Sequence, residues 1–333
     1  MRQRSRATLF FTVLLTLALL PLSLSGCAPQ EPPEEEAADD TVLLGFSQLG
    51  WESAWRIGNS RDIQEAAERA GVQLMFDNAQ QKQENQIKAI RSFIAYQVDV
   101  IAFAPIVEQG WDTVLQEAKA AGIPVLLTDR LIVTEDPSLY VGYVGADFLA
   151  EGRRAGEFLV EKADREGLTD LKIVELSGTP SSSPMQQRGE AFRECIAGDP
   201  RFEIVETMSG DFLRSKGKEC MQEMLERHER IDVLFSHNDA MTLGAIEAIE
   251  EAGLRPGEDV IIITVDGEQA AIDFLQEGKI NCVVECTPML GDIIMDLAKK
   301  LAAGEEIPRV TNPEERAFTE FDEDLMDIPP RGY

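Results

Sequence analysis

Carboxylates, arginines and an asparagine follow short apolar runs at several points along this 333-residue chain. Four such groups are Asp129-Arg130, Asn238-Asp239, Asp266-Gly267 and Glu285. Hydroxyl groups both donate and accept hydrogen bonds, so carboxylates and amides are natural partners for them. Arginine adds a rigid fork that can hold two neighbouring oxygen atoms. These residue types suit the binding of a neutral polyol such as a sugar.

The same carboxylates are also the groups that a glycosidase or another exported hydrolase would need. Here, however, the acids are interleaved with arginine and asparagine, and the sequence contains no nucleophile elbow or triad order. We therefore predict a binding protein and not an enzyme.

The apolar runs predict the strands that must position these groups. Short Val- and Ile-rich runs separated by stretches of helical period favour βαβ units and a parallel sheet. Residues 41–145 predict strands 42–46, 72–76, 98–104 and 124–128, with helices 55–70, 83–96 and 111–121. The second stretch predicts strands 171–176, 203–208, 233–235, 260–264 and 280–284, with helices 149–162, 185–197, 214–227, 240–252 and 269–276. Helix 290–303 and a short irregular tail follow.

Two doubly wound α/β lobes in tandem place a cleft between facing strand ends, where ligands of such sheets bind. Polar groups and aromatic planes that could reach this cleft are Trp51, Trp55, Arg56, Asp129, Arg130, Asp147, Arg188, Phe212, Asn238, Asp239, Asp266 and Glu285. Each has a structural alternative: the tryptophans could be core, and Asp129-Arg130 could be a surface turn. One residue of Asn238-Asp239 should cap the following helix, and we expect Asn238 to face the ligand.

The N-terminal residues predict export. Arg2, Arg4 and Arg6 precede an apolar segment, Leu9–Leu20, which is shorter than the roughly 20 residues of a membrane span. Leu24-Ser25-Gly26-Cys27 resembles the lipobox of bacterial lipoproteins, which implies a signal peptide at residues 1–26 and lipidation of Cys27. Residues 27–40 are acidic and Pro-rich, which predicts a disordered tether.

Charge and cysteine usage exclude some partners and leave one disulfide open. The net charge is −29, which repels nucleic acid and disfavours a transcriptional regulator on the same fold. Cys195 and Cys220 could pair in an oxidising compartment, whereas Cys282 and Cys286 are too far apart on one strand to bridge. With His228 and His237 as the only histidines, we predict no metal site and no cofactor.

Several segments carry a resemblance that spans nearly the whole body of the chain. They are 45–56 (GFSQLGWESAWR), 80–105, 123–130 (IPVLLTDR), 209–219 (SGDFLRSKGKE), 237–259 and 265–270 (VDGEQA). The sequence resembles type I periplasmic binding proteins of the ribose/galactose class and, within them, is most similar to galactofuranose-binding proteins. The resemblance implies a monomeric, lipid-anchored, extracytoplasmic receptor that delivers a monosaccharide to the permease subunits of an ABC importer. A sugar receptor for chemotaxis or for a sensor kinase remains the alternative.

The resemblance also implies which residues bind the sugar, position by position. The family's site falls here on Glu52, Trp55, Arg56, Asp129, Arg130, Asp147, Arg188, Phe212, Asn238, Asp266 and Glu285. Two departures stand out. The region Thr179–Gln187 is rich in Ser and Pro, and Glu285 stands where ribose binders often carry Gln.

By the same resemblance, each lobe is assembled from two separate parts of the chain. The N-terminal lobe would comprise residues 41–145 plus 286–308, and the C-terminal lobe residues 146–285 plus 309–333. The chain would thus cross a three-strand hinge near Gly145, Glu285 and Pro308. The lobes of such a receptor close around the ligand.

Overall fold

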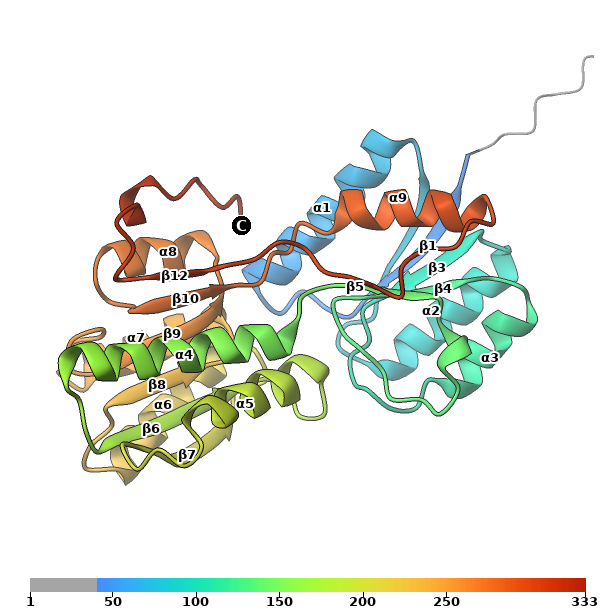
Figure 1. Cartoon of the computed structure of the whole chain (residues 1–333). Helices are drawn as coiled ribbons and strands as arrows, with labels where there is room; N and C mark the ends of the chain where they lie inside the picture. Colours follow the sequence, from blue (N-terminus) through green and yellow to red (C-terminus); the bar gives the residue numbers. More distant parts are fainter. Residues whose placement is uncertain (1–40) are drawn as a thin grey trace, which may run out of the picture. The chain divides into compact units, whose positions relative to one another are not determined.

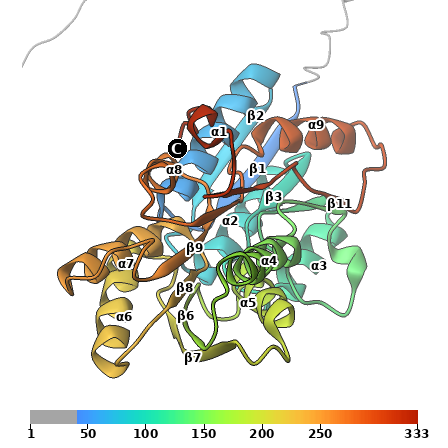
Figure 2. The same cartoon turned by 60° about the vertical axis from the view of Figure 1, so that its left-hand side comes forward.

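The computed structural model describes residues 41–333, which are drawn in Figures 1 and 2. The expected signal peptide, the tether and the lipidation site at Cys27 lie outside the described residues. None of the helices described is long and apolar enough to cross a membrane.

The first half of the fold is a six-stranded sheet in which all strands run parallel, in the order β11-β5-β4-β3-β1-β2. Its strands are β1 (Leu43–Gln48), β2 (Gln73–Asn78), β3 (Val100–Phe103), β4 (Val125–Thr128), β5 (Gly142–Val144) and β11 (Val310–Thr311). Strands β3 and β4 are buried at every position. Such fully apolar strands are typical of parallel sheets that helices cover on both faces.

Four helices cover the two faces of this sheet. Helices α1 (Ala54–Ala70) and α9 (Gly291–Ala302) lie side by side on one face (Figure 1), where Ile63 and Ile294 join the core. Helices α2 (Gln83–Tyr96) and α3 (Asp112–Ala120) cover the other face. Helix α1 ends at Gly71, whose left-handed φ of 65° permits the C-cap that the sequence predicted.

The second sheet repeats this plan, in the order β12-β10-β9-β8-β6-β7. Its strands are β6 (Leu171–Ser177), β7 (Phe202–Ser209), β8 (Val233–Ser236), β9 (Ile261–Asp266), β10 (Cys282–Glu285) and β12 (Ala317–Thr319). Only β12 runs antiparallel to its neighbour among these six strands. Two six-stranded α/β lobes therefore confirm the predicted fold class.

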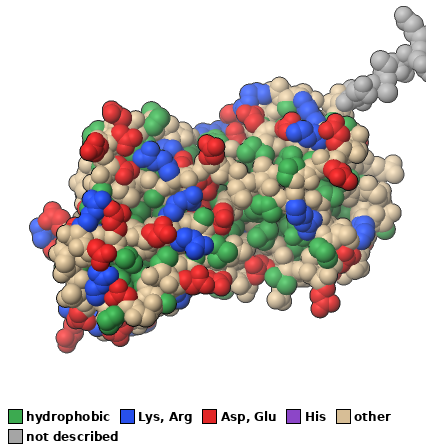
Figure 3. All heavy atoms as spheres, viewed as in Figure 1, with side chains coloured by type: hydrophobic (Ala, Val, Ile, Leu, Met, Phe, Trp, Pro, Cys, Tyr) green, Lys and Arg blue, Asp and Glu red, His purple; other side chains and the backbone are tan. Residues whose placement is uncertain are grey.

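Helices again cover both faces of the second sheet. Helices α4 (Phe148–Glu166) and α5 (Ser183–Ile196) pack together on one face (Figure 2). Helices α6 (Arg214–Arg227), α7 (Asp239–Glu251) and α8 (Gln269–Gln276) cover the other. On the outer surface of both lobes, acidic and basic side chains are interspersed over the face shown in Figure 3.

The chain crosses between the two sheets three times. It passes from β5 to α4 around Gly145, from β10 towards α9 after Glu285, and from β11 to β12 between Thr311 and Ala317. The third crossing thus comes later than the expected position at Pro308, because Val310–Thr311 still pairs with β5 of the first sheet. Residues 309–311 therefore belong with the N-terminal lobe.

Short strands account for what the sequence prediction missed. Strands β5, β11 and β12 have two or three residues each and were not expected, and the tail after α9 is less irregular than predicted. Two 3₁₀ turns, η1 (Pro137–Leu139) and η2 (Leu325–Asp327), complete the elements. A run of two or three residues carries too little periodicity to identify a strand, so pairing with a neighbour defines these elements.

The four cysteines within residues 41–333 are all free thiols. Cys195 on α5 lies 3.6 Å from the Arg153 carbonyl oxygen, and Cys220 on α6 lies 3.7 Å from that of Ser209. The disulfide that was left open between these two is therefore not formed. Cys282 and Cys286 are both buried, as predicted.

Close packing of α6 against α7 depends on glycine and leads to a stability prediction. A Cβ atom added at Gly244 would overlap the backbone carbonyl oxygen of Arg214 on α6. Alanine would gain about 1 kcal/mol of helix propensity, but forcing two backbones apart should cost more. We expect Gly244→Ala to lower the free energy of unfolding by about 1–3 kcal/mol, measured by urea denaturation.

The matched control Lys299→Ala, on the exposed side of α9, should change the free energy of unfolding by less than about 0.5 kcal/mol. Equal stability of the two variants would contradict the packing argument.

Candidate functional site

A polar cavity of about 330 Å³ lies where the ends of the strands of the two lobes face each other. The N-terminal lobe contributes Glu52, Ser53, Trp55, Arg56, Asp129 and Arg130 to its lining, and the C-terminal lobe contributes Pro184, Arg188, Phe212, Asn238 and Asp266, with Cys286 from the second crossing. Nine of the eleven residues predicted from the sequence meet here.

Arg56 forms ion pairs with two acids that line the N-terminal side of the cavity. Its Nε donates to Glu52 Oε1 at 3.0 Å and its Nη2 to Asp129 Oδ2 at 2.6 Å. Burial by itself would lower the pKa of Arg56, but the carboxylates of Asp129 and Glu52 raise it overall. Arg56 lies in the first turn of α1, which Ser53 caps, and Asp129 directly follows β4. The bond between them therefore fixes the start of α1 to the end of β4.

Arg130 is held less completely, and two buried polar atoms in this region remain unpaired. Its Nη1 donates to the Ile106 carbonyl oxygen at 3.1 Å, but its Nε finds no hydrogen-bond partner within residues 41–333. The same holds for Oε2 of Glu52. Burial and the neighbouring Arg56 lower the pKa of Arg130 to about 10, which still leaves it charged at neutral pH. A buried donor and a buried acceptor without partners are costly, and a ligand that bonds both removes that cost.

On the opposite wall, Arg188 is fixed from behind. Its Nε donates to Glu151 Oε2 at 2.6 Å, and its Nη1 donates to the His237 carbonyl oxygen at 2.7 Å. Both side chains of this ion pair are almost completely buried. Desolvation works to lower the pKa of Arg188, but Glu151 more than compensates and raises it. The guanidinium is therefore a permanently charged, preoriented donor.

The aromatic residue Phe212 lines the cavity and has a strained backbone conformation. Phe212 is 5% exposed and has a φ of 63°, in the left-handed region that residues other than glycine rarely adopt. Its ring packs so closely on Gly178 that a Cβ there would overlap it, and the Arg130 guanidinium lies 5.4 Å from its centroid. Asp129, with a φ of 58°, and Asp266, with a φ of 128°, share this feature. Such strain concentrates at functional sites.

Asn238 caps α7 and also lines the cavity. The sequence had indicated only that one residue of Asn238-Asp239, and not which one, caps this helix. The Oδ1 of Asn238 accepts from the Met241 amide and caps α7, and its Nδ2 donates to the Phe212 carbonyl oxygen at 3.4 Å. Asp239 does not cap α7. Its carboxylate accepts from the amides of Gly267 and Glu268, both at 2.7 Å, and so shapes the turn that presents Asp266.

Two predicted site residues do not line the cavity. Asp147 is exposed and caps α4, where its Oδ1 accepts from the Ala150 amide at 3.0 Å. Glu285 pairs with Arg331 of the C-terminal segment and accepts from the Arg316 amide. Trp51, from the wider list, is 51% exposed and packs near Phe76. Asp147 follows a strand and Glu285 ends one, but Asp147 bonds to the nearby Ala150 amide and Glu285 to the distant Arg316 and Arg331.

Sequence reasoning missed three lining residues. Ser53 could have been found as the N-cap before α1, and Pro184 as the proline in the first turn of α5. Cys286 was placed on a strand with Cys282, but the strand ends at Glu285 and Cys286 begins the crossing. Its carbonyl oxygen accepts from the indole Nε1 of Trp55 at 2.6 Å. No sequence signal indicated that contact, which joins residues 231 positions apart.

The lobes also touch at the mouth of the cavity, through the Ser- and Pro-rich region before α5. The Leu131 amide donates to Ser183 Oγ at 2.9 Å, and the Glu108 amide donates to the Ser181 carbonyl oxygen at 3.2 Å. Gln186 adds a bond from its Nε2 to Glu108 Oε2 at 2.6 Å. The structure is therefore that of a closed form, in which the segment Thr179–Gln187 bonds to the N-terminal lobe.

Basic and acidic side chains line the cavity in equal number: three arginines and three acids (Arg56, Arg130 and Arg188; Glu52, Asp129 and Asp266). Burial and the neighbouring Asp239 raise the pKa of Asp266 well above its usual range. A balanced set of donors and acceptors suits a neutral, hydroxyl-rich molecule better than an ion. Neither histidine of the described chain lines this cavity: His228 bonds Glu206, and His237 bonds Glu175.

Comparison with known proteins decides the family. The model of the periplasmic binding protein domain matches residues 44–306, which is most of the chain. The chain belongs to the periplasmic binding protein family. This finding confirms the resemblance seen in the sequence.

This periplasmic binding protein is similar to several characterised sugar receptors. It is 42% identical over 262 residues to the galactofuranose-binding protein YtfQ of Escherichia coli K12, covering 78% of this chain and 81% of that one. A Mycobacterium smegmatis protein in complex with β-D-fucofuranose matches with a TM-score of 0.82 and 48% identity, over 84% of this chain and 92% of that one. The arabinose ABC transporter component of Shewanella sp. ANA-3, bound to α- and β-L-arabinofuranose, gives 0.81 and 40%, over 86% and 94%. By name, YtfQ binds galactofuranose, and the two solved structures hold furanose sugars.

The buried acids beside the cavity predict how stability changes with pH. Burial and Glu268 raise the pKa of Asp239 to about 8, whereas an unfolded Asp titrates near 4. Between about pH 4 and pH 8 the folded chain thus binds more protons than the unfolded one, so its stability falls as the pH rises. Asp239→Asn removes this titration and should make the decline in urea midpoint between about pH 5 and pH 8 smaller. The surface variant Asp147→Asn should keep the wild-type slope, and an unchanged slope in Asp239→Asn would show that Asp239 is ionised throughout.

Proposed function

We propose that this chain is the solute receptor of an ABC sugar importer and that it holds one neutral monosaccharide, in furanose form, in the cavity between its lobes. One observation carries the proposal: a buried cavity, lined by equal numbers of arginines and acids, that leaves Glu52 Oε2 and Arg130 Nε without hydrogen-bond partners in the described chain. A carboxylate oxygen and a guanidinium N–H fit one sugar hydroxyl each. The furanose ligands of the similar M. smegmatis and Shewanella proteins support the ring form.

The contacts follow from the geometry of the lining. Glu52 and Asp129 accept from hydroxyls, Arg130 and Arg188 donate to hydroxyl or ring oxygens, and Asn238 and Asp266 complete the set from the C-terminal lobe. Trp55 and Phe212 offer apolar faces to the C–H side of the ring. Because these groups come from both lobes, the closed form makes more bonds to the sugar than an open one. The sugar therefore shifts the population towards closure.

The closed receptor would present both lobes to permease subunits and would act as a monomer without a cofactor or a catalytic step. The N-terminal sequence supports a location outside the cytoplasm, with residues 1–26 removed, Cys27 lipidated and residues 27–40 serving as a tether. Several acyl chains, each CH₂ contributing about 0.8 kcal/mol, would hold the receptor on a membrane surface. The sugar-binding relatives support binding as the role of the cavity.

Replacement of Arg130 tests the site directly. A thermal-shift screen that includes arabinose, galactose and ribose first identifies a ligand, and calorimetry then compares affinities. Arg130→Ala should weaken binding by about tenfold or more, since a charge-assisted hydrogen bond is worth about 1.5–3 kcal/mol.

Arg91→Ala, at an exposed ion pair with Glu117, is the matched control and should bind as the wild type does. Circular dichroism should show that both variants are folded. If folded Arg130→Ala binds the sugar with wild-type affinity, the cavity is not the binding site.

A further inference from the structure

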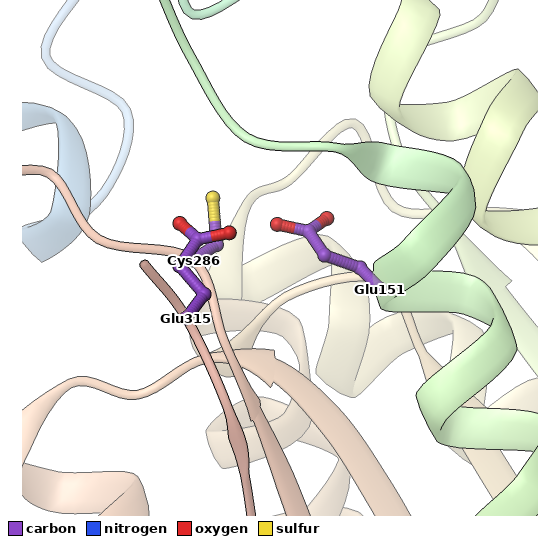
Figure 4. Close-up of side chains that lie close together, drawn as sticks. All are labelled: Glu151, Cys286 and Glu315. Carbon is purple, nitrogen blue, oxygen red and sulfur yellow. The ribbon is translucent and has the colours of Figure 1, made fainter. Parts of the chain in front are cut away.

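Three side chains with metal-ligating atoms converge at the hinge, outside the set of sugar contacts. Glu151 projects from the first turns of α4, Cys286 follows β10, and Glu315 lies between β11 and β12. One oxygen of each carboxylate and the cysteine Sγ all lie within 4.8 Å of one another. Figure 4 shows the Glu151 carboxylate reaching across towards Cys286 and Glu315. Cys286 and Glu315 lie on the second and third crossings, and Glu151 lies on α4 shortly after the first.

An unpaired atom distinguishes this cluster from an ordinary group of acids. Glu151 is fully buried, and its Oε2 is bonded to Arg188. Its Oε1, however, has no hydrogen-bond partner within residues 41–333. Glu315 is half-buried, and its Oε1 accepts from the Thr287 amide at 2.8 Å. A buried carboxylate oxygen without a partner calls for a proton or a cation at that point.

The local charges favour a cation with more than one positive charge. Arg188 is the partner of Glu151, but it also faces Asp266 across the cavity. Glu315 has no Lys or Arg side chain within ion-pair distance in the described chain. Between them, Glu151 and Glu315 thus have one basic partner, Arg188.

The donor set selects the class of ion. Two carboxylate oxygens and one thiolate sulfur form a mixed hard and soft set, which suits borderline divalent metals such as Zn²⁺ and Co²⁺. Mg²⁺ and Ca²⁺ prefer oxygen ligands throughout. Three protein ligands within 4.8 Å of one another would leave a fourth tetrahedral position for water.

We propose that Glu151, Cys286 and Glu315 bind a zinc-class divalent ion at the hinge. Ligation replaces the thiol proton of Cys286, which leaves to solvent, by a metal–sulfur bond. The bound ion joins α4 to the second and third crossings. It also fixes Glu151, which orients Arg188 in the sugar cavity. This site goes beyond the proposed sugar receptor and does not depend on it.

Cobalt spectroscopy of the purified full chain tests the proposal without any sugar. Co²⁺ should produce a thiolate-to-metal charge-transfer band at one equivalent, and Zn²⁺ should abolish the band. Cys286→Ser should lose the band. Cys220→Ser is the matched control, because Cys220 is also a buried free thiol but is not part of the cluster, and it should keep the band.

Zinc affinity, measured by competition with a chromophoric chelator, tests the carboxylates. Glu315→Gln should weaken Zn²⁺ binding by at least about tenfold. Losing a residue that only supports a metal ligand already costs about 10–100-fold in metal affinity, and Glu315 would be a direct ligand. Glu285→Gln, at a neighbouring acid that pairs with Arg331, should not. The proposal is overturned by the absence of a charge-transfer band in the wild-type chain, by a band that survives in Cys286→Ser, or by wild-type Zn²⁺ affinity in Glu315→Gln.

Discussion

The ion pairs that fix two buried arginines, Arg56 and Arg188, on opposite sides of one cavity are the constraint on which the rest of the structure depends. A buried guanidinium is tolerated only when carboxylates and carbonyl oxygens meet it with good geometry. Arg56 meets Glu52 and Asp129, and Arg188 meets Glu151 and the His237 carbonyl oxygen. These bonds fix α1 to β4 and α4 to α5. The elements that carry the ligand groups are thereby held rigidly within each lobe, and movement is left to the three crossings.

Backbone strain is distributed in the same way. Asp129, Phe212 and Asp266 all have positive φ angles and all border the cavity. Each is held by packing or hydrogen bonds around it: Asp129 through Arg56 and Phe212 through Gly178 and Asn238. The Asp239 carboxylate holds the turn after Asp266. The scaffold thus imposes a geometry on these residues that their local sequence would not adopt, so that their side chains point towards a common centre.

How much the sequence could predict depends on the range of the interactions involved. Long periodic segments such as Gln83–Tyr96 and Arg214–Arg227 were predicted to the residue. The strand-end residues Asp129 and Asp266 reach the cavity because parallel strands all end on one side. Asp147 was assigned to the site by resemblance, but a local bond to the Ala150 amide turns it away. Cys286, Glu151 and the two-residue strand β11 depend on partners more than 30 residues distant. No pattern of neighbouring residues encodes such contacts.

The central claim is that the cavity accepts an uncharged sugar because its arginines are already matched by acidic side chains. The most direct test is a calorimetric comparison of two ligands that differ by one charge. The first is whichever neutral aldose gives the largest thermal shift, and the second is the corresponding aldonate, in which C1 is a carboxylate. The neutral sugar should bind at one site per chain. The aldonate should bind at least about a hundredfold more weakly, because it would bury a further negative charge in a lining whose three arginines are already matched by three acidic side chains. Equal or tighter binding of the aldonate would contradict the account.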